Sequence, residues 1–438
     1  MNYKIGIRHE DKYVLERRTP LAPKHVEYLT NHEKLEVVLE NSPKRVFKNE
    51  EYINVGATIA ENLDDVPVIF GVKEIPEEYF EPEKTYVFFS HVIKGQPHNM
   101  PMLKRMKELK CNLIDYEKVE DELGRRLIFF GHYAGVAGMI NTLWALGLRL
   151  KYKGFETPLL KINQAHKYNS LREAKEIISD VGYEIAENGM PDGLEPLTIG
   201  LTGYGNVSRG AQEILDLLPG KDITPEELLS LQGRQKHPKN IFYKVVFREQ
   251  HLVQPVDPAH GFELQDYYQN PQDYVSIFDR YTPYLGVLMN CMYWDERYPK
   301  LITKDMLKRH FNSNEPKLMA VGDITCDVDG SIESTVKATE IQDPIYVYDP
   351  FKDDIQMGHE GEGLLTMAVD ILPSELPRES SIAFGDALTD FVPAIATASY
   401  DTATFMELEL PDPIKKALIL YRGEFTPDYK YLEEHLPE

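Results

Sequence analysis

Short apolar runs alternate with amphipathic stretches along the first third of the chain. Five runs rich in Val, Ile, Phe and Tyr predict β-strands at Tyr3–Arg8, Glu36–Leu39, Val66–Val72, Tyr86–Ser90 and Leu113–Tyr116. Segments between them predict helices or helix starts at Pro20–Thr30, Glu50–Gly56 and Met100–Leu109. Strands that alternate with helices favour parallel βαβ units, so this region predicts a parallel sheet covered on both faces.

A long helix is predicted next, over Gly131–Lys153. Its small residues recur at three- and four-residue spacing, which favours close packing against another backbone. It is also the most membrane-like stretch of the chain, but it carries His132, Asn141 and Arg149, whereas a membrane span needs about 20 mostly apolar residues. We therefore predict a buried helix and no membrane partner.

A second strand–turn–helix unit begins at Leu197. Its parts are a strand at Leu197–Thr202, a glycine-rich turn at Gly203–Gly210 and a helix at Ala211–Leu218. Further strands are predicted at Val287–Cys291, Leu318–Val321 and Ile345–Tyr348. The polar, Pro- and Tyr-rich region of about 221–285 between them is interpreted as an insertion.

Composition restricts the class of partner. The 438 residues include 48 Lys and Arg against 71 Asp and Glu, a net charge of −23, which argues against nucleic acid and anionic membranes. Three scattered cysteines and a charged start without an apolar run indicate a reduced, cytoplasmic protein. No metal-ligand spacing is present among the histidines and cysteines, so no metal site is predicted.

The glycine turn is typical of a dinucleotide site. Gly203 permits the tight turn, Gly205 lets the backbone approach a pyrophosphate, and the helix N-terminus offers free N–H groups. Ser208 stands at the third glycine position and is small enough for helix–strand packing. The alternative is a strand–helix turn without a ligand.

The choice between the two nicotinamide coenzymes depends on the residues after the strand Phe242–Phe247. Arg248 would suit a 2′-phosphate and favours NADP(H), whereas Glu249 as a ribose ligand would favour NAD(H). We expect NADP(H), with NAD(H) as the alternative.

Two side chains at strand ends are candidates for chemistry. Lys73 follows Val66–Val72 and His91 follows Tyr86–Ser90, and parallel sheets place ligand groups at the carboxyl ends of their strands. Each alone has an ordinary alternative, a surface lysine or a loop histidine. Together with a dinucleotide turn they suggest an amino-acid dehydrogenase.

Several longer motifs carry a family resemblance. They are Glu16-Arg-Arg-x-Pro-Leu-x-Pro23, Gly71-Val-Lys73, Phe89-Ser-His91, Ile114-Asp-Tyr-Glu117, Tyr133-Ala-Gly-Val-Ala-Gly-Met-Ile-Asn141, Gly203-x-Gly-Asn-Val-Ser-x-Gly-Ala-Gln212 and Leu372-Pro-x-x-Leu-Pro377. With them the chain resembles, nearly end to end, the lysine-ketoglutarate reductase half of the α-aminoadipic semialdehyde synthases of animals and plants. More distantly it resembles the fungal lysine-forming saccharopine dehydrogenases, and through both the alanine dehydrogenase/transhydrogenase superfamily.

The resemblance implies a set of site residues. The catalytic pair falls on Lys73 and His91. The implied substrate-binding residues are Arg18, Glu74, Gln96, Glu117, Arg126 and Phe130. The predicted cofactor-binding residues are Gly203, Gly205, Asn206, Val207, Ser208, Arg248, Asp323 and Leu372.

The resemblance also implies a reaction, in which lysine condenses reversibly with 2-oxoglutarate and the imine is reduced by NADPH to saccharopine. Arg18 and Arg126 can bind the substrate carboxylates through two parallel hydrogen bonds. Which of Lys73 and His91 acts as base, and which as acid, stays open. The alternatives are a related amino-acid or opine dehydrogenase, such as an alanine dehydrogenase, and a non-catalytic dinucleotide-binding relative.

The expected fold class is α/β, with two Rossmann-like doubly wound domains and an interdomain cleft. Residues 1–133 plus 386–438 are predicted to form a discontinuous substrate and catalytic domain, and residues 134–385 a dinucleotide-binding domain. The chain stops where the family's saccharopine-oxidising enzyme would begin, so we expect the product to leave or to pass to a separate protein. The oligomeric state stays open.

Overall fold

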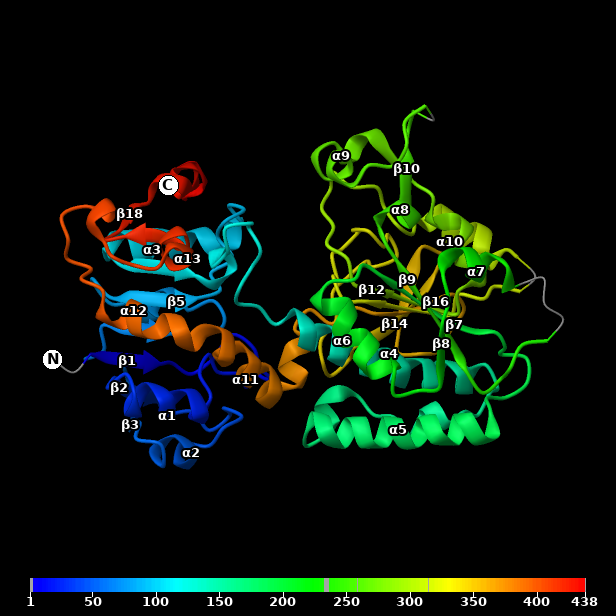
Figure 1. Ribbon diagram of the computed structural model, residues 1–438, viewed down its shortest axis with the longest axis horizontal. Helices are drawn as coiled ribbons and strands as arrows, with labels where there is room; N and C mark the ends of the chain where they lie inside the picture. Colours follow the sequence, from blue (N-terminus) through cyan, green and yellow to red (C-terminus); the bar gives the residue numbers. More distant parts are fainter. Residues whose placement is uncertain (1–2, 232–235, 258, 314, 438) are drawn as a thin grey trace. The chain divides into compact units, whose positions relative to one another are not determined.

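A computed structural model describes residues 3–231, 236–257, 259–313 and 315–437. The chain divides into two compact units. Unit 1 comprises Met1–Phe130 and Pro377–Glu438, and unit 2 comprises Gly131–Leu376. Figure 1 shows the blue and red ends of the chain together in unit 1. The chain therefore enters and leaves unit 2 once.

Unit 1 is built on an eight-stranded sheet. In spatial order its strands are β18 (Glu424–Phe425), β17 (Leu418–Tyr421), β6 (Asn112–Asp115), β5 (Thr85–Phe88), β4 (Val68–Phe70), β1 (Lys4–Ile7), β2 (Glu36–Glu40) and β3 (Thr58–Ala60). The six strands from the first third of the chain are parallel, and β17 and β18 add an antiparallel edge. The predicted strands of this region are confirmed to within a few residues.

The helices of unit 1 are α1 (Pro23–Asn31), α2 (Asn49–Ile53), α3 (Met100–Glu108), α11 (Pro377–Leu388), α12 (Val392–Thr397) and α13 (Asp412–Lys416). Strands β4, β5 and β6 are buried on both faces, and their side chains pack with those of the helices in one apolar core. Strand β1 lies between β4 and β2. The chain continues from β1 to β2 and β3 on one side, and then to β4, β5 and β6 on the other, so the strand order changes direction between β1 and β4. Open α/β sheets bind ligands at such a point.

Unit 2 holds a second eight-stranded sheet. In spatial order its strands are β15 (Asp354–Met357), β14 (Ile345–Asp349), β16 (Leu364–Met367), β13 (Ala320–Asp323), β12 (Val287–Asn290), β7 (Leu197–Thr202), β9 (Phe242–Phe247) and β8 (Gly220–Asp222). The six strands other than β14 and β15 are parallel. The helices are α4 (Gly131–Tyr152), α5 (Leu171–Asn188), α6 (Asn206–Leu215), α7 (Pro225–Leu229), α8 (Glu249–Leu252), α9 (Leu264–Gln269) and α10 (Lys304–Phe311).

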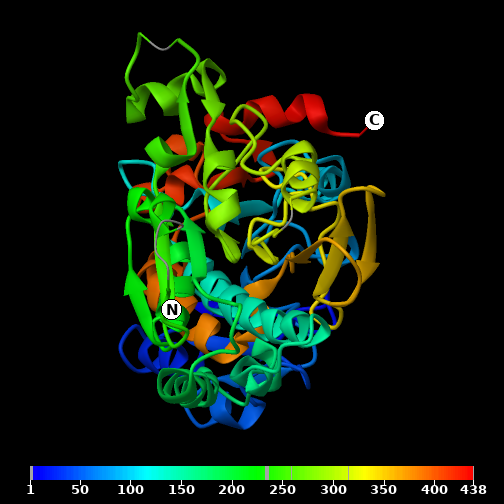
Figure 2. The ribbon, with the colours of Figure 1, turned by 90° about the vertical axis from the view of Figure 1, so that its right-hand side faces the viewer.

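The region 221–285 is only partly an insertion. Its described part supplies β9 and most of β8 to the sheet, because the apolar run of β9 pairs along the whole length of β7. The excursion proper is the later part, in which β10 (Val253–Pro255) and β11 (Tyr274–Ser276) form a separate antiparallel pair. Figure 2 shows this green segment with α9 standing away from the strands of the sheet.

The small residues of α4 pack as the sequence predicts. A Cβ added at Gly135 of α4 would lie 1.8 Å from the backbone oxygen of Val207, and one at Gly210 of α6 would lie 2.0 Å from that of His132. The two helices therefore touch backbone to backbone. Among the described residues, no helix is long and apolar enough to cross a membrane.

Candidate functional site

Lys73 and His91 lie beyond the carboxyl ends of neighbouring strands of unit 1. Strand β4 ends at Phe70, strand β5 ends at Phe88, and the two strands pair in parallel. Each candidate side chain follows its strand by three residues, so both leave the same edge of the sheet. The structure thus brings together the pair that the sequence placed at separate strand ends.

The backbone that carries Lys73 is held by a buried acid. Glu10 accepts hydrogen bonds from the N–H groups of Val72 at 2.7 Å and Lys73 at 2.9 Å. Burial raises the pKa of Glu10, although its contacts with Arg8 and these N–H groups oppose the rise. The Lys73 ammonium lies 5.9 Å from the ring centre of Tyr13. Sequence reasoning missed Glu10, although it follows strand β1 by the same three residues.

Glu74 connects the two strand ends electrostatically. Its Oε1 lies 2.8 Å from Nδ1 of His91 and accepts a hydrogen bond from Lys12 Nζ at 2.5 Å. Burial raises the pKa of Glu74, but the contacts with His91 and Lys12 outweigh it and lower the pKa to about 2. The carboxylate therefore stays charged and orients the imidazole through Nδ1. His91 adopts a positive φ of 50°, and Asn99 donates to its backbone oxygen at 3.1 Å.

Arg18 forms a buried ion pair with Glu16. Its guanidinium donates to both carboxylate oxygens of Glu16, at 2.8 and 2.6 Å, and lies 4.2 Å from the ring centre of Phe130. Phe130 in turn stacks on Phe384 at 4.4 Å. Although burial raises the pKa of Glu16, Arg18 holds it below its ordinary value. The guanidinium that the sequence assigned to a substrate carboxylate is therefore bound to Glu16.

Arg126 is the more accessible of the two candidate arginines. Its side chain is 49% exposed and forms an ion pair with Glu117, whose N–H donates to Asp115 at 2.8 Å. Gln96, the remaining candidate, accepts a hydrogen bond from the backbone N–H of Lys94 at 3.2 Å. These contacts place Glu117 and Arg126 next to one another, with Gln96 in a separate loop after β5.

Asp115 is a buried acid that sequence reasoning did not select. It ends strand β6, next to β5, and accepts hydrogen bonds from the backbone N–H and the hydroxyl of Ser90. Burial raises the pKa of Asp115 above its ordinary value. The strand-end rule applied to Lys73 and His91 did not select it, because Asp115 lies inside the predicted strand Leu113–Tyr116. Its contacts fix the loop that leads to His91.

In unit 2 the glycine turn joins β7 to α6. Gly203 has a φ of 78°, and Gly205 caps a helix that begins at Asn206 rather than at the predicted Ala211. The helix begins early because the turn needs only two glycines. A Cβ at Gly205 would meet nothing within 4 Å, so the backbone there faces open space, while Ser208 is fully buried. Free N–H groups of the first helical turn at such a site suit a phosphate.

A cavity of about 280 Å³ adjoins this turn. It is lined by Gly203, Tyr204, Gly205, Glu249, Leu252, Tyr267, Tyr268, Cys291, Met292, Tyr293 and Tyr298. Within it, the Glu249 carboxylate accepts hydrogen bonds from Tyr268 at 2.7 Å and Tyr204 at 3.5 Å. Arg248 lies 5.0 Å from the ring centre of Tyr204. Sequence reasoning noticed the tyrosines of this region but could not place them around the turn.

The other predicted cofactor residues lie in the interior of unit 2 or on α6. Asp323 is buried at the end of β13 and accepts hydrogen bonds from Asn290, Thr325 and Thr335. Burial raises its pKa. Leu372 is buried against Gly138 of α4. On α6, the Asn206 side chain accepts from Arg209, and Val207 contacts α4 through its backbone oxygen. Asp323 and Leu372 are therefore embedded in side-chain packing.

Comparisons with known proteins give a consistent picture. Residues 6–137 match the alanine dehydrogenase/PNT N-terminal domain family. The chain is 38% identical to the α-aminoadipic semialdehyde synthase of Arabidopsis thaliana, over 98% of this chain and 41% of that protein. It is 36% identical to the mitochondrial α-aminoadipic semialdehyde synthase of Rattus norvegicus, over 98% of this chain and 47% of that protein. The chain thus spans less than half the length of these relatives.

A third relative is covered almost fully. The saccharopine dehydrogenase (NAD(+), L-lysine-forming) of Yarrowia lipolytica is 24% identical over 88% of this chain and 90% of that protein. Among solved structures, an L-alanine dehydrogenase aligns with a TM-score of 0.62 at 16% identity, covering 99% of this chain and 100% of that one. A transhydrogenase from Sinorhizobium meliloti aligns with a TM-score of 0.56 at 13% identity, covering 97% and 99%. These findings confirm the family resemblance and the two Rossmann-like α/β folds.

Proposed function

We propose that this chain, whose residues 6–137 form an alanine dehydrogenase/PNT N-terminal domain, condenses L-lysine with 2-oxoglutarate and reduces the product to saccharopine. In this reaction the ε-nitrogen attacks the ketone carbon and the adduct loses water to give an imine. The imine carbon then accepts a hydride and the nitrogen a proton. A bound reduced nicotinamide dinucleotide supplies the hydride. The reverse reaction releases lysine.

The observation that carries this proposal is the group formed by Lys73, Glu74 and His91 at one sheet edge. The reaction needs a base to deprotonate the ε-ammonium and an acid to protonate the departing hydroxyl. Glu74 holds His91 by Nδ1, which directs Nε2 toward a ligand. The Lys73 main chain is fixed by the two hydrogen bonds to Glu10. We assign proton transfer to Lys73 and His91 as a pair.

Saccharopine carries three carboxylates, so the site must supply positive charge. Arg126 is half exposed and can exchange Glu117 for a substrate carboxylate at little cost, because exposed ion pairs are weak. Arg18 is buried with Glu16, and breaking that pair would leave a buried carboxylate without its partner. We therefore assign direct carboxylate binding to Arg126. Arg18 and Phe130 then form the wall of the site, and Gln96 is a further polar contact.

The same proposal assigns the coenzyme to the glycine turn of unit 2. Gly205 faces open space beside a cavity, which is what a pyrophosphate requires of the turn. Arg248, whose guanidinium lies over the Tyr204 ring, would suit a 2′-phosphate, which favours NADP(H). Glu249 lines the cavity and would accept a hydrogen bond from a ribose hydroxyl, which is the interaction that NAD(H) uses. We propose NADP(H) as the preferred coenzyme, with Glu249 as the residue that limits the preference.

The test is a coenzyme-oxidation assay with defined substrates. The full chain is mixed with NADPH and 2-oxoglutarate, and the amine is varied among lysine, ornithine and ammonia. Turnover is expected with lysine. It should be absent when either lysine or 2-oxoglutarate is omitted. Turnover with ammonia and pyruvate but not with lysine would replace this proposal by an alanine dehydrogenase activity.

Variants test the assignment of residues. Lys73→Met and His91→Gln are each expected to lower turnover by at least about a hundredfold, because positioned acid–base groups contribute on that order. Coenzyme binding should change little, since both residues belong to unit 1. Lys94→Met is the matched control, because Lys94 is exposed in the same loop as His91. Full activity of either catalytic variant would contradict the assignment.

A further inference from the structure

Unit 2 contains a second cavity, at the amino ends of its strands. It has a volume of about 400 Å³, and Leu197 of β7 and Val287 of β12 line it where those strands begin. Leu146 and Leu150 of α4 cover it from one side. The glycine turn follows the opposite end of β7, and six strand residues separate the two ends by about 20 Å. The cavity is therefore distinct from the coenzyme site proposed above.

Two lysines line this cavity, and carboxylates lie in their wider surroundings, Glu362 near Lys153 and Glu195 and Glu315 near Lys317. Within the described residues, the ammonium groups of Lys153 and Lys317 form no ion pair or hydrogen bond. Burial lowers the pKa of both groups. Glu315 also lines the cavity, so two ammonium groups and one carboxylate leave the lining with a net positive charge. An anion that entered would gain charge-assisted hydrogen bonds from groups that now lack them.

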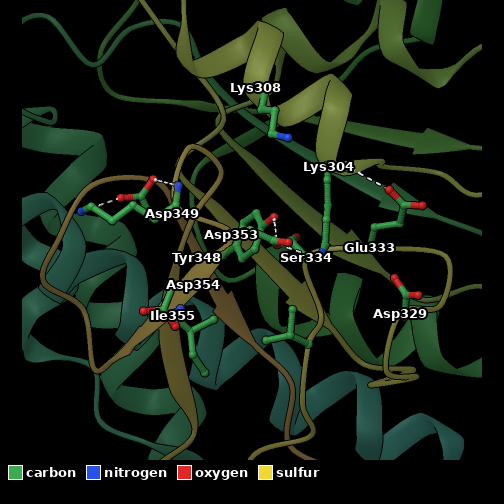
Figure 3. Close-up of polar contacts among 12 residues, drawn as sticks. Lys304, Lys308, Asp329, Glu333, Ser334, Tyr348, Asp349, Asp353, Asp354 and Ile355 are labelled. Carbon is green, nitrogen blue, oxygen red and sulfur yellow. Dashed lines mark hydrogen bonds and ion pairs between the residues drawn. The ribbon is translucent and has the colours of Figure 1, made fainter.

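Lys304 of the same unit provides a contrast. Lys304 donates to Asp353 at 2.7 Å, and Tyr348 donates to the same carboxylate at 2.7 Å. Figure 3 shows Asp353 between these two side chains. Lys304 therefore differs from Lys153 and Lys317 in having a close counter-ion.

The size and lining define a class of ligand. At about 30 Å³ per water molecule, the cavity holds the equivalent of about thirteen waters, or a molecule of roughly ten to fourteen non-hydrogen atoms. We propose that it binds a small monocarboxylate with an apolar body. The carboxylate is held by Lys153 and Lys317, and the apolar part packs against Leu146, Leu150 and Met190. This site is independent of the reaction proposed for the chain.

The test compares an acid with its neutral analogue. The full chain is titrated by calorimetry with 4-phenylbutanoate and with 4-phenyl-1-butanol. Saturable binding of one molecule is expected, with the acid about tenfold tighter than the alcohol, and the double variant Lys153→Met/Lys317→Met is expected to remove this difference. Lys304→Met is the matched control and should bind like the wild type.

A second measurement needs no variant. The wild-type chain is acetylated with an amine-reactive reagent and its lysines are mapped by mass spectrometry. 4-Phenylbutanoate should slow the acetylation of Lys153 and Lys317 but not that of Lys304. Absence of saturable binding, equal affinity of acid and alcohol, or unchanged acetylation of both cavity lysines would overturn the proposal.

Discussion

Two glycines five residues apart should respond in opposite ways to the same substitution. Gly205 has a φ of −75°, which any residue adopts, and a Cβ there meets nothing within 4 Å. A Cβ at Gly210 would lie 2.0 Å from the backbone oxygen of His132, although Cβ contacts under 3.0 Å essentially never occur. Helices α4 and α6 would have to separate by about 1 Å, and overpacking of this kind costs about 1–3 kcal/mol.

These numbers convert into measurable changes. For a unit of this size, Gly210→Ala should lower Tm by roughly 2–12 °C. Gly205→Ala should cost less than about 1 kcal/mol as a helix cap. Its methyl group would occupy the space that a pyrophosphate approaches, so the affinity for NADPH should fall by about tenfold or more.

The assay measures thermal unfolding by circular dichroism, with and without NADPH, and coenzyme binding by nicotinamide fluorescence. Gly205→Ala should unfold at nearly the wild-type temperature but lose the stabilisation that NADPH gives. Wild-type coenzyme affinity in Gly205→Ala would refute the placement of the pyrophosphate. Wild-type stability in Gly210→Ala would refute the backbone contact between α4 and α6.

Four further substitutions probe the two units separately. Glu74→Gln should lower the free energy of unfolding at pH 7 by about 3 kcal/mol, because the Glu74 pKa is held at about 2 against an ordinary 4.5. This stabilisation is complete well above pH 4.5 and is lost as the pH falls toward 2. Urea unfolding should therefore show a smaller stability difference between the wild type and the variant at pH 4 than at pH 7. Equal stabilities of the two proteins at pH 7 would contradict this prediction. Arg248→Ala should lower the ratio of kcat/KM for NADPH to kcat/KM for NADH, and Glu249→Gln should raise it. Steady-state kinetics with both coenzymes measures this ratio. An unchanged ratio in both variants would exclude these residues from coenzyme selection. Arg149→Met should destabilise unit 2 by about 3–5 kcal/mol, because the guanidinium donates to three backbone oxygens of the 359–363 loop at 2.7–2.9 Å; a thermal midpoint equal to that of Lys151→Met, an exposed neighbour, would refute this.

Sequence periodicity predicted the central strands of the sheets well because these strands are buried on both faces. Strand β7 has the predicted bounds, since all six of its residues are buried. The start of α6 was placed five residues too late, because glycine-rich sequence indicates a turn whether or not a helix follows at once. The sequence also could not show that β8 and β9 join the sheet, since strand pairing depends on contacts distant along the chain.

The positions of the candidate residues at the strand ends could be predicted from the sequence, but their hydrogen-bond and ion-pair partners could not. The strand-end rule brought Lys73 and His91 to one edge, because the carboxyl ends of parallel strands must meet there. The partners of these residues depend on tertiary packing. Nothing in the spacing of Arg18 distinguishes a guanidinium that binds a substrate from one that is bound by Glu16. Likewise the burial of Asp323 among three hydrogen-bond donors is a property of the folded sheet.

The central claim concerns the fate of one nitrogen atom. Lysine labelled with heavy nitrogen at the ε position is incubated with the full chain, 2-oxoglutarate and NADPH, and the products are identified by mass spectrometry. Saccharopine that carries the label, formed in equal amount to the NADPH oxidised, is the predicted result. Label recovered only as unreacted lysine or free ammonia while NADPH is consumed would contradict the account.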